Sequence, residues 1–415
     1  MQLKSDYKQT EVGVIPENWN AVLLDTVARR GSGHTPDKKH PEYWNGSIKW
    51  VSLQDSSSLD KLYIEDSAAT ITPAGILNSS AVLHPEGTVV LSRDAGVGKS
   101  AIMKSEMAVS QHFMAWQCGS KLNNHFLYYW LQARKSEFER IANGSTIKTI
   151  GLPYFRSFYI PLPEFYEQCE IATALTDVDS LLTTQDKLVA KKRDIKQAVM
   201  QQLLSGKERL QGFSGKWKHV SLDNITTRLT GVWGINAPSE NHPKHAEIIR
   251  AGDITQDGLL TGTAQRFLSE LEYAKAHCLL DDVVITTSGN GLGKVWWCDA
   301  RPDIAASNFV RILRPIHTRA NGRFLFYALK SGVGLQQLNE HTATSAYPNL
   351  RPSFFSSEWV LLPPILEQKA IADILSDIDS DITTLEKQRD KTCALKQGMM
   401  QELLTGRIRL VNPTT

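Results

Sequence analysis

No stretch of this 415-residue sequence approaches the roughly twenty consecutive apolar residues that a membrane-spanning helix needs. The opening residues MQLKSDYKQTEVG lack the apolar core of a secretory signal peptide. The five cysteines include no Cys-x-x-Cys pair, and no histidines are spaced beside them as zinc ligands would be. These absences argue against a disulfide-stapled secreted protein, and we expect a cytoplasmic chain with reduced, mostly buried thiols.

Strong charge of either sign is also missing, because the formal net charge is only +2. Many nucleic-acid-binding domains are distinctly basic. If this protein binds DNA, it reads base edges while a partner supplies much of the phosphate contact. The composition, with 41% hydrophobic and 22% charged residues, is that of a globular protein. The length predicts about two to four domains.

The signature motifs of several enzyme classes are absent. DAGVGKS at Asp94 has Arg93 where a phosphate-binding loop needs its first glycine, and the similar SGNGLGKV has Ser288 there. Both segments are better interpreted as glycine-rich loops between strands. Methyltransferase Asn/Asp-Pro-Pro-Tyr/Phe, Gly-x-Ser-x-Gly and His-Glu-x-x-His motifs do not occur. His34 and His112 have no partner cluster in the sequence, so no metal site is expected.

What the sequence does contain is an internal repeat. Residues 167–210 align without a gap to residues 367–410, with 21 of 44 positions identical. Upstream the match is weaker but continues, because Trp19 recurs as Trp217 and FLYYWL recurs as FLFYAL. The chain is therefore two copies of a unit of roughly 200 residues. Within each unit the first part has diverged and the last part has not.

The similar segments have the pattern of long helices. Residues 167–204 contain no proline or glycine, and apolar residues recur at spacings of three and four, as in a coiled-coil seam. The predicted seam residues are Ile171, Leu175, Val178 and Leu182, and then Ile371, Leu375, Ile378, Ile382 and Leu385. Later apolar positions step by four to Leu395, Met399 and Leu403, which predicts a local relaxation of the supercoil.

The ends of these segments carry helix signals. Both follow a proline-containing stretch, and both are followed by a glycine, Gly206 or Gly406, that fits a left-handed C-terminal cap. In the first segment acidic residues dominate the early turns and basic residues the late ones, an order that suits the helix dipole. If the two helices pair, they are antiparallel, and a pseudo-twofold axis relates the two copies.

Similar helices beside diverged domains indicate two like partners and two unlike ligands. A DNA site with two different halves is such a ligand, since dimeric readers place two units about one helical turn, ~34 Å, apart. The alternative is a non-catalytic coiled-coil adaptor that joins two different protein ligands. A methyltransferase or nuclease is the third possibility, and the missing motifs disfavour it.

Three stretches resemble the specificity subunit of type I restriction–modification systems. They are the opening GVIPENW with VLLDTVARRGSGHTPDKKHPEYWNGSIKWVSLQD, the boundary PLPEFYEQCEIATAL with its copy LLPPILEQKAIADIL, and the helix ending KQAVMQQLLSGKERL with its copy KQGMMQELLTGRIRL. The resemblance covers essentially the whole chain. It implies an α+β architecture of two mixed α/β target recognition domains and two long antiparallel spacer helices. The expected segments are recognition domains at 1–160 and 211–360 and helices at 161–210 and 361–415.

The resemblance also implies the partners. Each recognition domain would read half of a bipartite double-stranded DNA target, and the helices would set the half-site spacing and dock two modification subunits. Restriction subunits would join to form the cleaving motor complex. The chain itself would hold no cofactor, with S-adenosylmethionine, ATP and Mg²⁺ on the partner subunits, and it would not be an enzyme.

Base reading requires Arg, Lys, Asn, Gln, Ser or Thr side chains on loops or strands that enter a groove. The candidates in the first domain are Arg29, Arg30, Lys38, Lys39, Arg93, Lys99, Gln111 and Lys148. Those in the second are Arg228, Arg250, Lys294, Asn308, Arg311 and Arg351. For each one, a solvated surface charge is about as probable as a DNA contact. The tryptophans Trp44, Trp50, Trp233, Trp296 and Trp297 are expected in the core. Strands are predicted near residues 48–53, 88–92 and 283–287, and a helix near 123–141.

Overall fold

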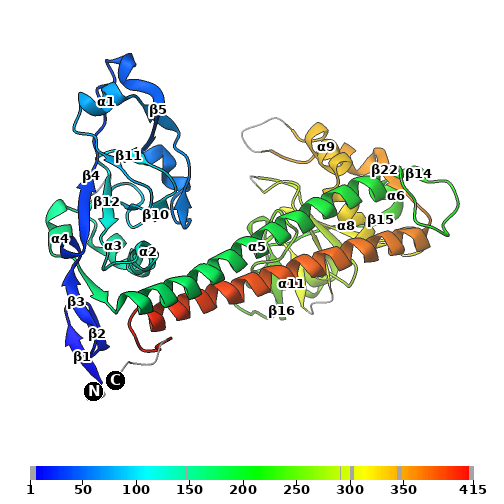
Figure 1. The fold of residues 1–415 in the computed structure, drawn as a ribbon. Helices are drawn as coiled ribbons and strands as arrows, with labels where there is room; N and C mark the ends of the chain where they lie inside the picture. Colours follow the sequence, from blue (N-terminus) through cyan, green and yellow to red (C-terminus); the bar gives the residue numbers. More distant parts are fainter. Residues whose placement is uncertain (1–5, 145–147, 290, 300–302, 344–347, 411–415) are drawn as a thin grey trace. The chain divides into compact units, whose positions relative to one another are not determined.

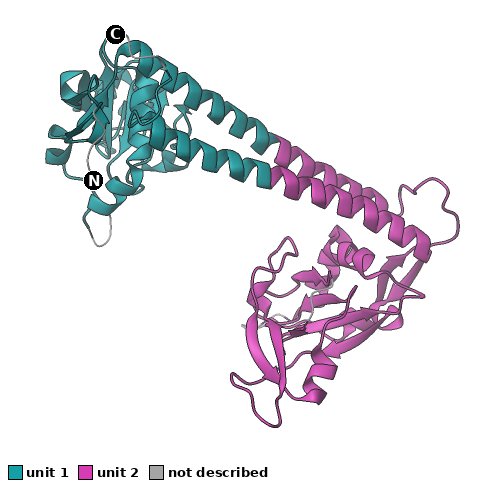
Figure 2. Ribbon diagram, turned by 90° about the horizontal axis from the view of Figure 1, so that it is seen from below, with its two compact units in different colours: residues 1–187, 387–415 teal, residues 188–386 magenta. Residues whose placement is uncertain are grey.

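The computed structural model describes residues 6–144, 148–289, 291–299, 303–343 and 348–410. The chain divides into two compact units, Met1–Lys187 with Lys387–Thr415, and Leu188–Glu386 (Figures 1 and 2). Each unit holds one mixed α/β domain and a segment of each of two long helices. No helix in the described ranges is long and apolar enough to cross a membrane.

The first unit is built from short strands and helices. Its strands are β1 (Tyr7–Thr10), β2 (Gly13–Pro16), β3 (Asn20–Leu23), β4 (Ala28–Ser32), β5 (Trp44–Val51), β6 (Tyr63–Ile64), β7 (Ala69–Ile71), β8 (Leu83–His84), β9 (Val89–Ser92), β10 (Ser100–Met103), β11 (Met107–Val109), β12 (Phe113–Cys118) and β13 (Tyr159–Leu162). Its helices are α1 (Pro73–Leu77), α2 (Asn124–Ala133), α3 (Lys135–Ile141) and α4 (Leu152–Arg156).

Two sheets form the centre of this domain, with strand orders β4-β12-β9-β10-β6 and β7-β5-β11-β8. Strand β9 pairs antiparallel with both β12 and β10, and all four of its residues are buried. Because successive side chains point to opposite faces, Val89 and Leu91 enter the core on the α2 side, whereas Val90 enters the core beneath the second sheet. The unbroken apolar run of β9 therefore marks a strand covered on both faces.

The second unit repeats this arrangement. Its strands are β14 (Lys218–Ser221), β15 (Thr226–Thr230), β16 (Lys244–Ile249), β17 (Ala264–Leu268), β18 (Val283–Thr286), β19 (Val295–Trp297), β20 (Ile304–Ala306), β21 (Val310–Pro315) and β22 (Glu358–Leu362). Its helices are α6 (Leu222–Ile225), α7 (Glu270–Ala276), α8 (Gly322–Lys330), α9 (Gly332–Glu340) and α10 (Ser353–Ser356). The sheet orders β15-β21-β18-β19 and β17-β16-β20 correspond to those of the first unit, so the repeat in sequence is a repeat of topology.

The predicted strands and helix are found, with one correction. The strands expected near 48–53, 88–92 and 283–287 are β5, β9 and β18. The single helix expected near 123–141 is two helices, α2 and α3, that meet at Arg134. Arg134 has a non-helical backbone, and its guanidinium lies over the Trp130 ring and donates to the Val12 carbonyl at 2.9 Å. This contact holds the chain in its bend.

The two similar segments are long helices, as predicted. Helix α5 (Phe165–Leu204) has 40 residues and α11 (Ile365–Leu403) has 39. Gly206 and Gly406 follow their ends with positive φ angles of 68° and 69°, the left-handed conformation that glycine adopts without steric cost.

The predicted seam positions differ in burial. Ile171 and Leu175 are fully buried, but in the core of the first domain, where they pack with Leu403 and Leu404. Ile371 and Leu375 are likewise fully buried, in the core of the second domain. Ile382 is buried, whereas Val178, Leu182, Ile378 and Leu385 are half-buried. Leu395 is 57% exposed, so its assignment to the seam is wrong, while Met399 is half-buried and Leu403 is buried. Much of the apolar pattern therefore serves packing against the domains, and the continuous coiled coil stays a prediction.

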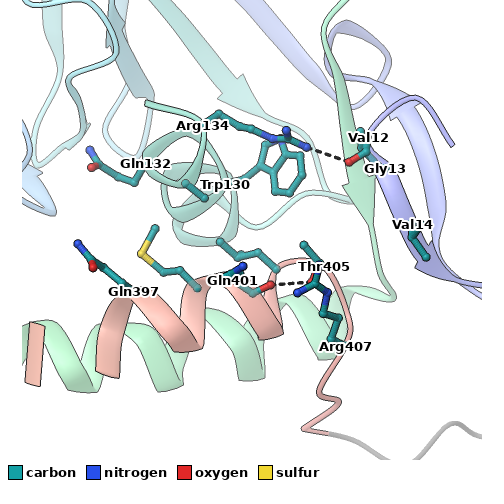
Figure 3. Close-up of a pocket in the computed structure, with 13 residues that line it drawn as sticks. Val12, Gly13, Val14, Trp130, Gln132, Arg134, Gln397, Gln401, Thr405 and Arg407 are labelled. Atoms are coloured by element: carbon teal, nitrogen blue, oxygen red, sulfur yellow. Dashed lines mark hydrogen bonds between the residues drawn. The ribbon is translucent and has the colours of Figure 1, made fainter. Parts of the chain in front are cut away.

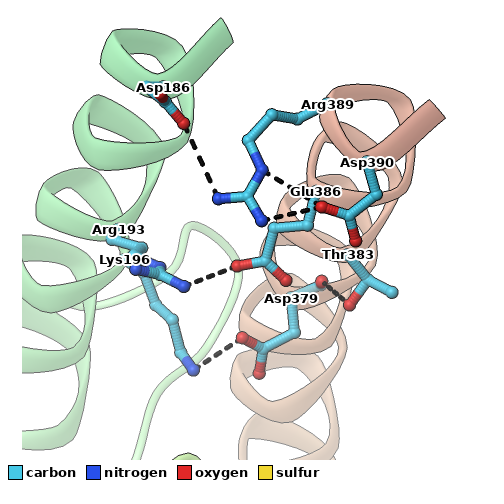
Figure 4. A network of polar contacts seen from close by, with 8 residues as sticks. All are labelled: Asp186, Arg193, Lys196, Asp379, Thr383, Glu386, Arg389 and Asp390. Carbon is cyan, nitrogen blue, oxygen red and sulfur yellow. Dashed lines mark hydrogen bonds and ion pairs between the residues drawn. The ribbon is translucent and has the colours of Figure 1, made fainter. Parts of the chain in front are cut away.

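Ion pairs join the two helices within each unit (Figure 4). In the first unit, Asp186 of α5 faces Arg389 of α11 at 3.6 Å. In the second unit, Lys192 pairs with Asp381 and Arg193 with Glu386, at 2.9 and 2.6 Å. These three pairs lie in the middle of both helices, with the acid on α5 in the first pair and on α11 in the other two. Each exposed pair contributes at most about 1 kcal/mol to the association of the helices.

A tyrosine from each domain enters this helix pair. Tyr129 of α2 donates to Asp179 of α5 at 2.8 Å, and Lys396 of α11 pairs with the other oxygen of that carboxylate. The second unit repeats the contact: Tyr327 of α8 donates to Asp379 at 2.8 Å, and Lys196 pairs with it at 2.6 Å. Burial raises the pKa of both tyrosines, so both remain protonated donors. The network fixes each domain on its two helix segments.

A buried carboxylate at the start of each long helix makes the second junction. Glu367 is fully buried and accepts from Trp217 Nε1 at 3.1 Å and from Arg209 Nε and Nη2 at 3.0 and 2.6 Å. Glu167 accepts from Trp19 Nε1 at 3.0 Å and from Arg409, whose Nη2 lies at 2.7 Å. Each arginine follows the end of the other helix, so each cluster joins the domain, the first turn of one helix and the chain beyond the other.

Replacing the buried carboxylate should destabilise the second unit. Glu367→Ala leaves the Arg209 guanidinium and the Trp217 indole without their acceptor, and we expect the free energy of unfolding to fall by about 2–4 kcal/mol. Glu358→Ala is the matched control, because Glu358 is exposed on β22. Denaturant unfolding of both variants measures the difference. Equal stability would mean that the cluster does not hold the junction.

Candidate nucleic-acid interface

The candidate DNA-binding residues of the first domain do not form one cluster. Arg93 and Gln111 meet at one edge, where Arg93 N donates to the His112 carbonyl at 3.0 Å. Lys148 lies beside them, since its carbonyl accepts from Ala95 N at 3.4 Å. The remaining candidates stand on β4 or in loops outside this group: Arg29, Arg30, Lys38, Lys39 and Lys99. Of the eight candidates that the sequence suggested in this domain, three lie together at one edge.

Some of these other residues have structural partners. Arg30 pairs with Asp25 at 3.2 Å. Lys99 donates to the Ser56 carbonyl at 3.0 Å and lies at the end of the β9–β10 loop. That loop joins two antiparallel strands, so the interpretation of DAGVGKS as a glycine-rich inter-strand loop is confirmed. The same is true of SGNGLGKV, which joins β18 and β19.

Asp94 and Thr35 also lie at the first edge, and neither was identified as a site residue from the sequence. His112 Nδ1 lies 2.7 Å from Asp94 Oδ2, and Arg93 Nε lies 3.6 Å from the other Asp94 oxygen. Thr35 Oγ1 donates to Gln111 Oε1 at 2.6 Å. His112 therefore has a carboxylate partner after all, although no metal-ligating group of three is found among the described residues. Because Asp94 and His112 are 18 residues apart in the sequence, no local spacing signal marks the pair.

In the second domain three candidates come together. Arg228, Asn308 and Arg311 line a surface pocket of about 530 Å³ with Thr287, Ser288, Phe309, Asn349, Leu350, Pro352 and Phe355. The Arg228 guanidinium lies over the Phe355 ring at 4.7 Å and is 3.8 Å from Asp223. The Arg311 guanidinium donates to the Asn308 carbonyl at 2.8 Å. Burial lowers the pKa of Arg311, and the charge of Arg228 lowers it further. The pocket therefore concentrates positive charge.

The other three candidates of this domain lie outside the pocket. Arg250 binds Asp253 through two nitrogens at 2.9 and 2.7 Å, so its charge is engaged in the fold. That partner raises the pKa of Arg250. Lys294 lies at the end of the β18–β19 loop, and Arg351 is exposed just before α10.

The two edges occupy the same place in the two domains. Ser110 and Ser307 are buried residues that each begin a two-residue turn, because Phe113 N donates to Ser110 O and Val310 N donates to Ser307 O. The turns differ in their two central residues, which are exposed Gln111 and half-buried His112 in one domain, and half-buried Asn308 and exposed Phe309 in the other. Aligning VSQHF with ASNFV could have revealed this correspondence.

In each domain a glycine is in close contact with the backbone at the turn. A Cβ on Gly33 would lie 1.5 Å from the Val109 carbonyl oxygen, and one on Gly231 would lie 1.9 Å from that of Ser307. Each glycine follows the first strand of its sheet, and the residues just after it stand beside the turn. In the second domain one of these is Trp233, which is 56% exposed. Its expected core location is wrong, whereas Trp50 and Trp296 are buried and Trp44 and Trp297 are half-buried.

The first unit also contains a surface pocket of about 600 Å³, apart from the candidate DNA-binding edge (Figure 3). It is lined by the β1–β2 hairpin, the end of α2 and the last turns of α11, through Val12, Val14, Trp130, Met400 and Leu404 among others. None of the candidate DNA-binding residues lines it. The pocket is mostly apolar and belongs to the junction between α2 and the end of α11.

Comparison with known proteins identifies a family and several relatives. The model of the type I restriction modification DNA specificity domain matches residues 16–192 and 215–392. The MjaVIII specificity subunit of Methanocaldococcus jannaschii is 23% identical over 99% of this chain and 97% of its own length. The EcoKI specificity subunit of Escherichia coli K12 is 24% identical over 96% and 90%. The MjaIX specificity subunit is 29% identical, but over only 44% of this chain and 43% of that one.

A solved structure has the same fold. The S subunit of the type I restriction–modification system from M. genitalium superposes with a TM-score of 0.57 over 97% of this chain and 98% of that one, at 15% identity. Two copies of the family domain thus coincide with the two repeats of the sequence.

The glycine contact beside the second turn yields a stability prediction. Gly231→Ala must displace the Ser307 carbonyl, and we expect it to lower the free energy of unfolding by about 1–3 kcal/mol or more. Gly252→Ala is the control, because a Cβ there meets nothing within 4 Å and no positive φ is required. Thermal unfolding compares the two variants. If they are equally stable, the close approach at Gly231 does not exist in solution.

Proposed function

This chain belongs to the type I restriction–modification DNA specificity family, and we propose that it reads a bipartite, asymmetric DNA target in which each globular domain recognises one half. The recognition domains are residues 1–160 and 211–360. The observation that carries the proposal is the pair of corresponding edges. The backbone of the turn and its neighbouring glycine are repeated, while the exposed side chains are different.

The charge distribution supports this reading. The chain as a whole is nearly neutral, at +2, yet Arg93 and Lys148 stand at one edge, and Arg228 and Arg311 at the other. Local positive charge at a polar edge suits contact with phosphates, while the neighbouring amide and hydroxyl groups suit base edges. Arg93 and Arg228 also have carboxylate neighbours, Asp94 and Asp223, but at 3.6 and 3.8 Å. Arg30 and Arg250 are held more closely, by Asp25 at 3.2 Å and Asp253 at 2.7 Å, and are less suited to DNA contact.

We assign the two long helices to spacing and docking. Helices of 40 and 39 residues that exchange ion pairs provide a stiff element for setting half-site separation. Their similar sequences, identical at 21 of 44 aligned positions, suit two copies of one partner, which we take to be the modification subunit carrying S-adenosylmethionine. Restriction subunits with ATP and Mg²⁺ would complete the complex. In this proposal the chain contributes recognition and no catalytic group.

Mapping of methylated adenines tests the function directly. With the gene intact we expect methylation at one interrupted, asymmetric motif, and with the gene deleted we expect that methylation to vanish. Methylation that does not change with the gene, together with no duplex binding by the chain and its co-purified partner at low salt, would instead favour the adaptor function.

A domain exchange tests the assignment of half-sites. Replacing residues 217–358 by the equivalent domain of another specificity subunit should change one half of the methylated motif and leave the other half and the motif's length unaltered. Glu367, Arg209 and Asp379 lie outside the exchanged segment, whereas their partners Trp217 and Tyr327 lie inside it, so the incoming domain must carry a tryptophan and a tyrosine at these two positions to retain the helix contacts. A change in both halves contradicts the division into two independent readers.

A further inference from the structure

Two aromatic rings stand exposed at the edge of the second domain. Trp233 and Phe309 are 56% and 39% exposed, and their ring centroids lie 5.2 Å apart in an edge-to-face arrangement. The other tryptophans of this domain that the sequence analysis placed in the core, Trp296 and Trp297, are buried or half-buried. Burial of large aromatic side chains is energetically favourable, so two such side chains exposed to solvent next to each other indicate a surface that binds a ligand.

The corresponding place in the first domain is polar. There Thr35 follows Gly33 as Trp233 follows Gly231, and Gln111 precedes His112 as Asn308 precedes Phe309. Thr35 and Gln111 are joined by a hydrogen bond of 2.6 Å. The equivalents of Trp233 and Phe309 are thus Thr35 and His112, and the same backbone presents polar side chains in one domain and an aromatic pair in the other.

The aromatic pair adjoins a cationic pocket. Phe309 lines the pocket that contains Arg228 and Arg311. Among the described residues Arg311 forms no ion pair, and Arg228 pairs only loosely with Asp223, whose Oδ1 is 3.8 Å from Arg228 Nε. Two guanidinium groups with so little opposing charge favour a polyanion beside the rings, which is what a DNA backbone supplies.

Resting on the proposed reading of DNA, we propose that Trp233 and Phe309 contact the 5-methyl group of a thymine in the half-site of the second domain, while the Arg228–Arg311 pocket holds a nearby phosphate. In the major groove the thymine methyl is the large apolar group that a base pair presents beside its hydrogen-bond donors and acceptors. The two aromatic rings beside a phosphate-binding pocket are suited to contact this methyl group. The Thr35–Gln111 pair of the first domain reads its half-site by hydrogen bonds instead.

The test removes the methyl group alone. Once the methylated motif has been mapped, each thymine of the second domain's half-site is replaced singly by deoxyuridine. Binding of the chain, in complex with its modification subunits, is then measured. At one position we expect the affinity of the wild type to fall roughly three- to fivefold, the ratio that corresponds to one buried methyl group. The variant Trp233→Ala with Phe309→Ala should bind the thymine and uracil duplexes equally.

Two further variants complete the design. Trp233→Thr with Phe309→His introduces the side chains of the first domain at this edge and should also abolish the discrimination. Leu271→Ala is the control, because Leu271 is 64% exposed on α7 of the same domain and lines no part of the pocket. It should keep the full difference between the two duplexes.

The outcomes separate the two proposals. If the wild type binds its mapped target but no uracil substitution weakens binding, or if the half-site contains no thymine, the methyl contact is wrong while the function stands. An undiminished uracil effect in the double alanine variant also overturns the contact. If the wild type binds no duplex specifically, the proposed function itself fails.

Discussion

A buried carboxylate at the first turn of each long helix is the contact on which the architecture depends. Glu167 and Glu367 lie almost without solvent, where an unpaired charge would be severely destabilising. Each must therefore gather its indole and guanidinium donors from segments remote in sequence. Arg209 is 158 residues from Glu367, and Arg409 is 242 residues from Glu167. The need to satisfy one charge thus brings the domain, a helix start and the chain beyond a helix end into one place in each unit.

The rest of each unit follows from that anchoring. The tyrosine, aspartate and lysine contacts are the same in both units, Tyr129 with Asp179 and Tyr327 with Asp379. They fix how a domain meets its helix segments. The units differ elsewhere, because the first also has the β1–β2 hairpin and the sheet strands β6 and β8. At the turns beside Gly33 and Gly231 the backbone is similar in the two units, while the side chains differ.

Local charge matters more here than net charge. The net charge is near zero because the 46 lysines and arginines are almost balanced by 44 aspartates and glutamates, some of which pair across the long helices. The arginines of the second edge are the contrast, since Arg311 is half-buried among polar groups and aromatic rings. In such a site a cation costs desolvation energy unless an anion arrives, so a nearly neutral chain can still present a strong site for a phosphate.

The sequence by itself determined the repeat, the two long helices with their glycine caps, several strands and the family, because these depend on periodicity and identity along the chain. It located three members of each edge, among them Gln111 and Asn308, but not Thr35, Asp94 or Phe309 beside them. Only the tertiary structure paired His112 with Asp94, exposed Trp233, and divided the apolar helix positions between domain cores and solvent. The reason is that burial depends on which segment packs over a residue. Spacing of three and four identifies a helix face, but it does not say whether a second helix, a domain core or, as at Leu395, water covers that face.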